Sequence, residues 1–436
     1  MQPPIEMFRG HRRRTLEAME PGSAMLLFGA HHATRSNDTE YRYRQHSDLL
    51  YTSGWTWPET AILLRPAAEQ QTVFFVQPKD PEREIWTGIR PGPVGAVEGF
   101  GADEAFDYQE LGSRLPALLQ GVHTLYYAVA EDADRDALVM GAIRKARRTA
   151  RRNGLSVPDA FIHPGRILHE LRLAKSDDEL QVMRRAAAIT VEAHQAAMAL
   201  VAPGVGEHEL EAVIDYTFRR RGGTGPGYTT IVGGGENACI LHYVENDQPL
   251  RDGDLVLVDA GCEFGWYTAD VTRTFPVNGT FSEPQRELYQ LVLDSQLAAI
   301  DQVRAGTPFN ELQDAAVRVL TQGLVALGLL SGRVDDLIAD QAYKRYYMHN
   351  IGHWLGMDVH DCGAYHLEGE SRPLEPGMVL TIEPGLYVAP DDDEAPERYR
   401  GIGVRIEDDV LVTTGDPDVL TGALGKTVAE IEALCG

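Results

Sequence analysis

The chain has little cysteine, and its cysteines are widely scattered. Its 436 residues contain only four, Cys239, Cys262, Cys362 and Cys435, with no CxxC pair among them. A zinc ribbon or a disulfide framework needs closely spaced or numerous cysteines, so the sequence indicates neither. This usage is typical of a reducing compartment, and we expect a cytoplasmic protein.

Long apolar runs and an excess of basic residues are also missing. No stretch approaches the roughly 20 apolar residues of a membrane span, and the run Ala24–Phe28 is too short for a signal peptide. The 65 acidic and 40 basic residues give a net charge of −25, which disfavours nucleic acid and anionic membranes as partners. The basic cluster Arg144–Arg152 is therefore interpreted as a solvated helix face or a subunit contact.

The length and an apolar content of 43% suffice for two domains. Residues 1–172 alternate helical segments, including Arg135–Arg152, with strand-like runs, which predicts an α/β domain. Ser176 is the expected N-cap of a long amphipathic helix, so we place the second domain at 173–436. The strand-like runs are Met25–Phe28, Ala61–Leu64, Thr72–Val76 and Thr124–Ala128.

Two aspartates stand in DAGCEFGWYTADVTRTF, a segment that otherwise resembles two apolar strands joined by a tight turn. The run Leu255–Val258 precedes Asp259, and a buried carboxylate needs a partner. A two-residue turn at Phe264 and Gly265 places Asp259 directly opposite Asp270, with Cβ atoms about 5 Å apart. We therefore predict that both carboxylates hold one ion or ion pair; two solvated turn acids are the alternative.

A second segment repeats this pattern. In DGDLVLVDAG, Gly253 is followed by an acid six positions on and a glycine eight positions on, and in EPGMVLTIEPG the same offsets from Gly377 lead to Glu383 and a glycine. Each half also has a second acid on the expected returning strand, Asp270 in the first and Glu407 in the second. Two such halves packed about a pseudo-twofold axis bring four carboxylates together.

Histidines lie between the two halves in YYMHNIGHWLGMDVHDCG, and one lies ahead of them, His242 in ENACILHYVEND. His349 and His353 have the spacing of the HExxH zinc helix, but Asn350 replaces its glutamate and the glycines disfavour a helix. We predict instead a strand and loop, ending near His360, that line a cavity. Taken alone, each histidine fits a hydrogen-bonded core or surface residue equally well.

Four carboxylates and one imidazole suit a hard or borderline divalent ion, such as manganese, cobalt or zinc, and exclude a soft thiolate site. Two ions about 3.5–4 Å apart activate a bridging water in many hydrolases. The sequence therefore predicts a dinuclear metallohydrolase.

Five motifs, in family order, resemble those of the pita-bread proline metallopeptidases, which include Xaa-Pro aminopeptidases, prolidases and, more distantly, methionine aminopeptidases. Residues 37–55, NDTEYRYRQHSDLLYTSGW, are similar to the opening domain of bacterial aminopeptidase P. The resemblance implies a creatinase-like α/β domain followed by an α+β pita-bread domain with a pseudo-twofold repeat. The motifs are VDAG (258–261), TADVTRTFPV (268–277), HNIGHWLGMDVHD (349–361), TIEPGLYV (381–388) and GVRIEDD (403–409).

The resemblance implies a set of metal ligands, carried over position by position. Two divalent ions are expected, with manganese preferred over cobalt or zinc, and Asp270 and Glu407 match the bridging positions. The five matching ligands are Asp259, Asp270, His353, Glu383 and Glu407.

Further matches concern catalysis and substrate. Glu383 matches the residue that accepts a proton from the attacking water, His242 and His360 match histidines that steady the tetrahedral intermediate, and Arg405 matches an arginine that orients carboxylates. A salt-bridge partner and a packed tyrosine are the alternatives for Arg405 and Tyr387, and a buried structural tryptophan is the alternative for Trp86. The residues matching substrate-binding or active-site-mouth positions are His349, Tyr387, Asp38 and Trp86.

The activity that the resemblance implies is that of an Xaa-Pro aminopeptidase, which releases the N-terminal residue from peptides with proline at position two. A prolidase, which cleaves dipeptides only, needs the same metal residues, and the likeness of the first domain favours the aminopeptidase. A non-catalytic binding module of this fold is disfavoured because all five ligands are present. The family also implies a homo-oligomer. Asn350 and Gly227 depart from the family pattern and concern the substrate pocket.

Overall fold

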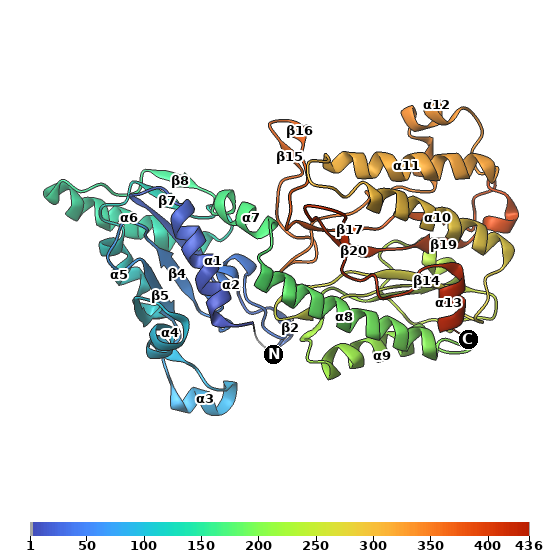
Figure 1. The fold of residues 1–436 in the computed structure, drawn as a ribbon. Coiled ribbons are helices and arrows are strands. Elements are labelled where there is room, and N and C mark those ends of the chain that lie inside the picture. The colour runs from blue at the N-terminus through green and yellow to red at the C-terminus, as the bar shows by residue number, and fades with distance from the viewer. Residues whose placement is uncertain (1–2, 436) are drawn as a thin grey trace. The chain divides into compact units, whose positions relative to one another are not determined.

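The computed structural model describes residues 3–435, which form two compact units (Figure 1). The first is Pro3–Leu171 and the second runs from Arg172 onward, so the division falls within helix α7 (Gly165–Leu173). Within residues 3–435, no helix is long and apolar enough to cross a membrane.

The N-terminal unit is an α/β unit. Its strands are β1 (Ser23–Phe28), β2 (Thr34–Ser36), β3 (Thr39–Glu40), β4 (Ala61–Leu64), β5 (Thr72–Val76), β6 (Glu104–Asp107), β7 (Thr124–Tyr126) and β8 (Ala160–Ile162). Its helices are α1 (Ile5–Ala18), α2 (Ser47–Ser53), α3 (Pro81–Thr87), α4 (Gly92–Phe100), α5 (Leu111–Leu118), α6 (Ala133–Asn153) and most of α7, with the 3-10 turn η1 (Tyr108–Glu110).

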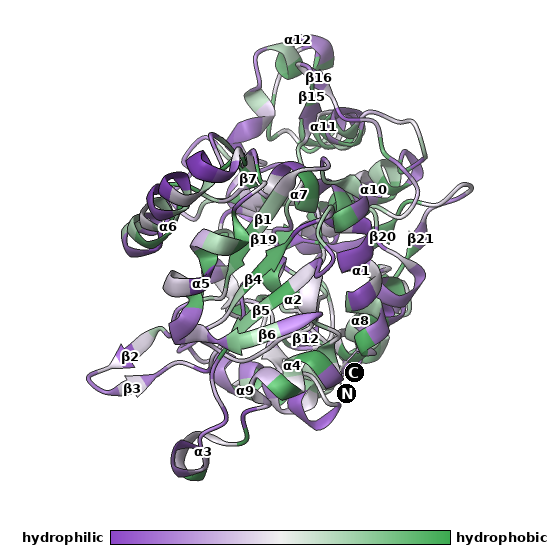
Figure 2. Cartoon of the chain, turned by 90° about the vertical axis from the view of Figure 1, so that its left-hand side faces the viewer, coloured by the Kyte–Doolittle hydropathy of each residue, from purple (hydrophilic) through white to green (hydrophobic). Residues whose placement is uncertain are grey.

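Six of these strands form one mixed sheet in the order β6-β5-β4-β1-β7-β8. The pairs β1–β7, β7–β8 and β5–β6 are parallel, whereas β1–β4 and β4–β5 are antiparallel. Strands β1, β4 and β5 are buried along their whole length, and β4 and β5 are predominantly hydrophobic in Figure 2. The expected strands are all present, although β7 ends at Tyr126 rather than at Ala128.

Helices α5 and α6 cover this sheet through apolar residues such as Leu115, Val139 and Ile143. Helix α6 begins after the N-cap Asp132, whose carboxylate accepts two backbone N–H bonds, and ends at Gly154 in a left-handed conformation. The basic residues of its last turns are exposed, as expected from the sequence.

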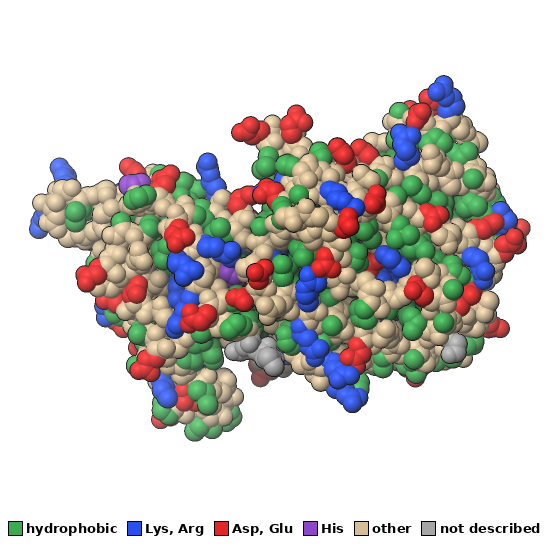
Figure 3. Space-filling view, viewed as in Figure 1, with side chains coloured by type: hydrophobic (Ala, Val, Ile, Leu, Met, Phe, Trp, Pro, Cys, Tyr) green, Lys and Arg blue, Asp and Glu red, His purple; other side chains and the backbone are tan. Residues whose placement is uncertain are grey.

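Helix α3 carries two large apolar side chains that are exposed. Trp86 is 87% exposed and Ile85 is 82% exposed. Hydrophobic atoms gather over this helix in the space-filling view (Figure 3). The alternative of a buried structural tryptophan at Trp86 is therefore wrong.

The second unit is an α+β unit with several small sheets. Its strands are β9 (Gly225–Pro226), β10 (Ile231–Gly234), β11 (Leu255–Asp259), β12 (Cys262–Phe264), β13 (Tyr267–Thr268), β14 (Thr272–Pro276), β15 (His366–Leu367), β16 (Glu370–Ser371), β17 (Val379–Ile382), β18 (Gly385–Val388), β19 (Ile402–Arg405), β20 (Asp408–Leu411) and β21 (Asp418–Val419). Its helices are α8 (Asp177–Leu200), α9 (Glu207–Arg220), α10 (Glu283–Asp301), α11 (Phe309–Ala326), α12 (Val334–Ala339) and α13 (Val428–Leu434), with the 3-10 turns η2 (Gly235–Cys239), η3 (Ala342–Arg345) and η4 (Glu397–Tyr399).

Each half of this unit packs a strand pair against helices. Val256 and Val258 of β11 share a core with residues of α8 and α9, and Leu380 and Ile382 of β17 share another with residues of α11. Helix α8 begins as expected, because Ser176 donates its backbone N–H to the Glu179 carboxylate at 2.8 Å. Because side chains alternate along a strand, the residues between these core positions point to the opposite face.

The first strand pair corrects the predicted hairpin. Phe264 pairs with Tyr267, so the turn residues are Gly265 and Trp266, which both have positive φ, and not Phe264 and Gly265. Phe264 remains on the strand because it packs against the small residues of α8. Asp259 consequently pairs with Thr272.

Asp270 therefore lies diagonally from Asp259 and does not face it. Its position is two residues closer to the turn than Thr272, the partner of Asp259. A displacement of two residues preserves the face on which a side chain lies. Both carboxylates thus still point to the same side of the strand pair.

The second strand pair has the arrangement that was predicted for the first. Ile382 pairs with Asp408, and Gly385 pairs with Arg405. These two pairings have the same register. Glu383 and Glu407 lie between them and therefore stand opposite each other. The two halves thus repeat the strand ends while differing in how their acids are paired.

Candidate metal centre and active site

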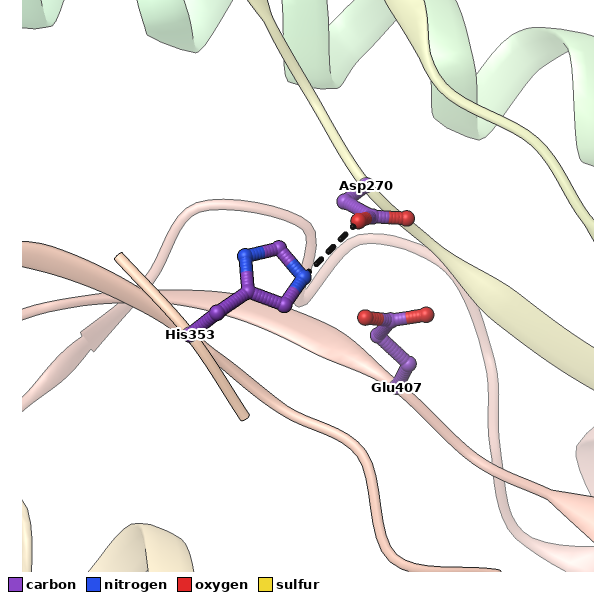
Figure 4. A group of neighbouring side chains, drawn as sticks. All are labelled: Asp270, His353 and Glu407. Carbon is purple, nitrogen blue, oxygen red and sulfur yellow. Dashed lines mark ion pairs between the residues drawn. The ribbon is translucent and has the colours of Figure 1, made fainter. Parts of the chain in front are cut away.

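Three side chains of the C-terminal unit converge on one point (Figure 4). Asp270 lies just before β14, Glu407 lies just before β20, and His353 lies in the segment that precedes β17. One ligand atom from each lies within 4.8 Å of the others. His353 Nε2 is 3.3 Å from Asp270 Oδ2. Two carboxylates and an imidazole so arranged suit a borderline divalent ion.

The other two predicted ligands lie beside this group. The Tyr228 hydroxyl donates to Asp259 Oδ1 at 2.6 Å and also contacts the Asp270 carboxylate. Glu383 Oε1 lies 3.7 Å from His353 Nε2. The structure therefore brings all five predicted ligands together.

A glycine allows the His353 segment to approach β17 closely. A Cβ atom on Gly352 would lie 1.9 Å from the Thr381 carbonyl oxygen, a distance that no side chain tolerates. Across this contact, Thr381 N–H donates to the His353 carbonyl at 2.9 Å and Glu383 N–H donates to the Ile351 carbonyl at 2.8 Å. The segment is strand-like, as predicted, and differs from an HExxH helix.

The electrostatics show that the centre is short of positive charge. Burial, reinforced by neighbouring acids, raises the pKa of Glu383 to about 7 and also raises the pKa values of Asp270 and Glu407. Burial lowers the pKa of His353, but Asp270 outweighs it and the pKa rises to about 9. Divalent cations neutralise such clustered acids and replace protons on their ligands, so the residues present fit a metal site.

Arg405 links both halves of the centre. Its Nη2 donates to Asp259 Oδ2 at 2.7 Å, and its Nε donates to Thr272 Oγ1 at 3.1 Å. Its Nη1 donates to the Tyr387 hydroxyl at 2.9 Å. The Arg405 side chain is only 4% exposed. Arg405 is thus a salt-bridge partner of Asp259, and its role in orienting the carboxylates stays a prediction.

Tyr387 extends this hydrogen-bond network to His349. The Tyr387 hydroxyl lies 3.0 Å from His349 Nε2, and His349 Nδ1 lies 2.9 Å from the Asn350 carbonyl. Nδ1 must donate to that carbonyl, so Nε2 accepts from Tyr387. Burial and the nearby Arg405 lower the pKa of His349 to about 4, which agrees with a neutral ring.

Sequence reasoning missed three residues that hold the carboxylates. Tyr228 bridges Asp259 and Asp270, and Thr272 donates from Oγ1 to Glu407 Oε2 at 2.7 Å. Thr381 Oγ1 lies 3.4 Å from Glu383 Oε1. The threonines stand on the same strand face as the acids, so period-two alternation is the signal that identifies them.

The centre opens into a cavity of about 630 Å³. The His353 and His360 rings meet edge to face, with centroids 4.3 Å apart. The lining of the cavity combines apolar side chains with the predicted catalytic groups, as expected for a pocket that binds a peptide end. The sequence-predicted residues that line it are His242, Asp259, Asp270, His349, His353, His360, Glu383, Arg405 and Glu407.

Two predicted substrate-region residues belong to the N-terminal unit. Asp38 is exposed between β2 and β3, and Trp86 is exposed on α3. Their suggested relation to the active-site mouth stays a prediction.

Comparison with known proteins identifies relatives of both units. The family model of metallopeptidase family M24 matches residues 181–414, and that of the aminopeptidase P N-terminal domain matches residues 8–126. The Xaa-Pro aminopeptidase of Escherichia coli strain K12 is 47% identical over 429 residues, which cover 98% of this chain and 97% of that protein.

Solved structures agree with these matches. The Pseudomonas aeruginosa aminopeptidase PepP covers 100% of this chain and 98% of its own, with 47% identity and a TM-score of 0.97. A zinc-substituted Escherichia coli aminopeptidase P in complex with product covers 100% of this chain and 99% of its own, with 46% identity and a TM-score of 0.96. The two-domain pita-bread fold expected from the sequence is thus confirmed, and the chain belongs to metallopeptidase family M24.

Proposed function

We propose that this M24 member is an Xaa-Pro aminopeptidase, which releases the N-terminal residue from peptides with proline at position two. One observation carries the proposal: Asp270, His353 and Glu407 converge in a chain whose 47% identical relative is named for this activity. The match of residues 8–126 to the aminopeptidase P N-terminal domain supports the aminopeptidase over the dipeptidase.

Five residues would hold two divalent ions in this proposal, with manganese as the preferred metal. When bound, such ions acidify water and neutralise the charge that develops on a carbonyl oxygen under attack. The zinc-substituted relative shows that a relative's site accepts a metal of this class. The ligands are Asp259, Asp270, His353, Glu383 and Glu407.

The roles of the remaining residues are assigned from the positions of their side chains. Glu383 is a suitable proton acceptor because its carboxylate lines the cavity and lies 3.7 Å from His353 Nε2. His242 and His360 reach the cavity and are assigned to the substrate carbonyl and the proline nitrogen. The neutral His349 and Tyr387 orient substrate, while Arg405 fixes the Asp259 carboxylate.

The wider setting of the enzyme is also proposed. A cytoplasmic location agrees with four free cysteines, and a homo-oligomer agrees with the exposed apolar surface of α3. The proposed domain boundary lies between residues 172 and 173. Asp38 is assigned to a family position near the subunit assembly and active-site mouth, and Trp86 to one that in relatives approaches a neighbouring subunit's site.

Hydrolysis of two substrates by the metal-stripped protein tests the function. With added manganese, we expect release of arginine from Arg-Pro-Pro-Gly-Phe, and little release without it. Cleavage of Gly-Pro alone would indicate a prolidase. No cleavage of either peptide with any divalent ion would refute the proposal and favour a binding module.

A further inference from the structure

One wall of the cavity is built from a segment without helix or strand. After η2, residues 240–248 are irregular, yet they supply three lining residues, Leu241, His242 and Val244. An irregular segment has no ladder of backbone hydrogen bonds to fix it, so other groups must define its position.

Glu207, the first residue of α9, supplies several of those groups, while Asn246 anchors the far part of the segment by accepting from Val232 N–H and donating to the Thr230 carbonyl, both at 2.9 Å. The Glu207 side chain is fully buried and accepts four hydrogen bonds, two on each carboxylate oxygen. Oε1 accepts from Gly234 N–H at 2.8 Å and from Asn237 Nδ2 at 3.0 Å. Oε2 accepts from the Tyr243 hydroxyl at 2.9 Å and from Gln248 N–H at 2.9 Å.

These bonds reach both ends and the middle of the segment. Gly234 and Asn237 lie before it, Tyr243 lies inside it and Gln248 ends it. Tyr243 is buried against the protein, whereas its neighbour His242 is exposed towards the cavity. Glu207 does not line the cavity itself, so any influence on the reaction passes through the segment.

We propose that Glu207 is a positioning residue for His242: its carboxylate sets the place of the 240–248 wall and thereby the reach of His242 to the substrate. The inference rests on the proposed function. It follows that Glu207 affects turnover more than ground-state binding, because His242 is assigned to the tetrahedral intermediate and none of the five metal ligands lies in the 240–248 segment.

Glu207→Gln tests this with little change of shape. The amide keeps one acceptor oxygen but presents an NH₂ group to the donors on the other side, where a backbone N–H cannot become an acceptor, so at least one hydrogen bond is lost. Glu209→Gln is the matched control, since Glu209 lies on the same turn of α9, is exposed, and accepts a hydrogen bond from Gly206 N–H at 2.7 Å.

The decisive measurement is kcat and KM on an Xaa-Pro peptide in two backgrounds, wild type and His242→Ala. We expect Glu207→Gln to lower kcat about tenfold in the wild type, with a smaller change in KM. In the His242→Ala background we expect less than about a twofold effect, because the residue through which Glu207 acts is absent. Bound metal and the Glu209→Gln control should stay at wild-type levels.

An equal loss in both backgrounds, or none in either, would overturn the role of Glu207. No cleavage by the wild type would instead refute the proposed function. If Glu207→Gln does not fold, Tyr243→Phe removes one of the four bonds and enters the same two-background comparison, with an expected loss of about threefold that again vanishes without His242.

Discussion

The two halves of the C-terminal unit reach the same chemistry by different pairings. In the first half Asp259 pairs with Thr272, and Asp270 lies two positions away. In the second half Glu383 and Glu407 lie at facing positions. The repeat therefore conserves the face on which each carboxylate lies, and leaves open which residue stands opposite it.

The halves also differ in what holds their acids. A neutral hydroxyl, Tyr228, bridges the two aspartates of the first half. Arg405 of the second half donates to Asp259 of the first, and Thr272 of the first donates to Glu407 of the second. Each half thus depends on the other for its hydrogen bonds.

The largest effect should come from removing a ligand at the point where both halves meet. We expect Asp270→Ala to lower metal-dependent hydrolysis by at least about a thousandfold, because the three-residue group then loses a charged member. Circular dichroism should show an intact fold. Full activity in this variant would contradict the assigned centre.

A second test breaks the connection between the halves in the core. Arg273 of β14 forms an ion pair with Asp408 of β20 at 2.8 Å, and both side chains are fully buried. Asp408→Asn leaves Arg273 without its counter-charge, so we expect unfolding to become easier by about 3–5 kcal/mol. Urea unfolding of the metal-free protein measures this, with the exposed Asp418→Asn as the control for an ordinary surface ion pair.

The same pair predicts a pH dependence. Burial acts to raise the pKa of Asp408, but Arg273 and Lys426 outweigh it and hold the pKa well below its usual range. The unfolded chain then binds a proton before the folded one does, so this stabilisation is complete above about pH 4 and is lost as the pH falls further. Asp408→Asn should show a shallower acid-side loss in unfolding experiments, and an unchanged slope would contradict it.

Two threonines, one in each half, allow a test whose expected effect is of intermediate size. Thr272 donates to Glu407 at 2.7 Å, whereas Thr381 lies 3.4 Å from Glu383. We expect Thr272→Val to weaken metal affinity about 10- to 100-fold and Thr381→Val to weaken it less. Titrating the two variants with metal measures this difference. An equal loss of metal affinity would show that the two threonines support their acids equally.

The smallest effect is expected at Tyr387, which supports the second half from outside the ligand set. Tyr387→Phe removes the hydroxyl between Arg405 and His349, while Arg405 keeps its bonds to Asp259 and Thr272. We expect kcat/KM to fall about three- to tenfold. A loss as large as that of Asp270→Ala would mean that Tyr387 takes part in the chemistry directly.

Strand-end acids could be predicted from sequence because a carboxylate after a buried apolar run needs a partner. The repeated glycine and acid offsets also placed Glu383 and Glu407 in one region. The hairpin register could not be predicted, since Phe264 packs on α8 and Trp266 adopts a left-handed conformation that few aromatic residues take.

Neutral supporting residues were the other omission. Tyr228 bonds to partners far away in sequence and no local pattern marks it, whereas Thr272 is marked only by its place on the same strand face as Asp270. Charged ligands are conspicuous in a strand, whereas a threonine is one of its ordinary residues. The site was therefore predictable in its charges and not in the network that holds them.

Gly352 contributes to this centre through the side chain that it lacks. The residue carries no functional group, yet the Thr381 carbonyl occupies the volume that any side chain would need. Any replacement must push apart the two segments that carry His353 and Glu383. The position is consequently closed to every other amino acid, and variation in this enzyme must be sought at the cavity wall and away from the seam between these segments.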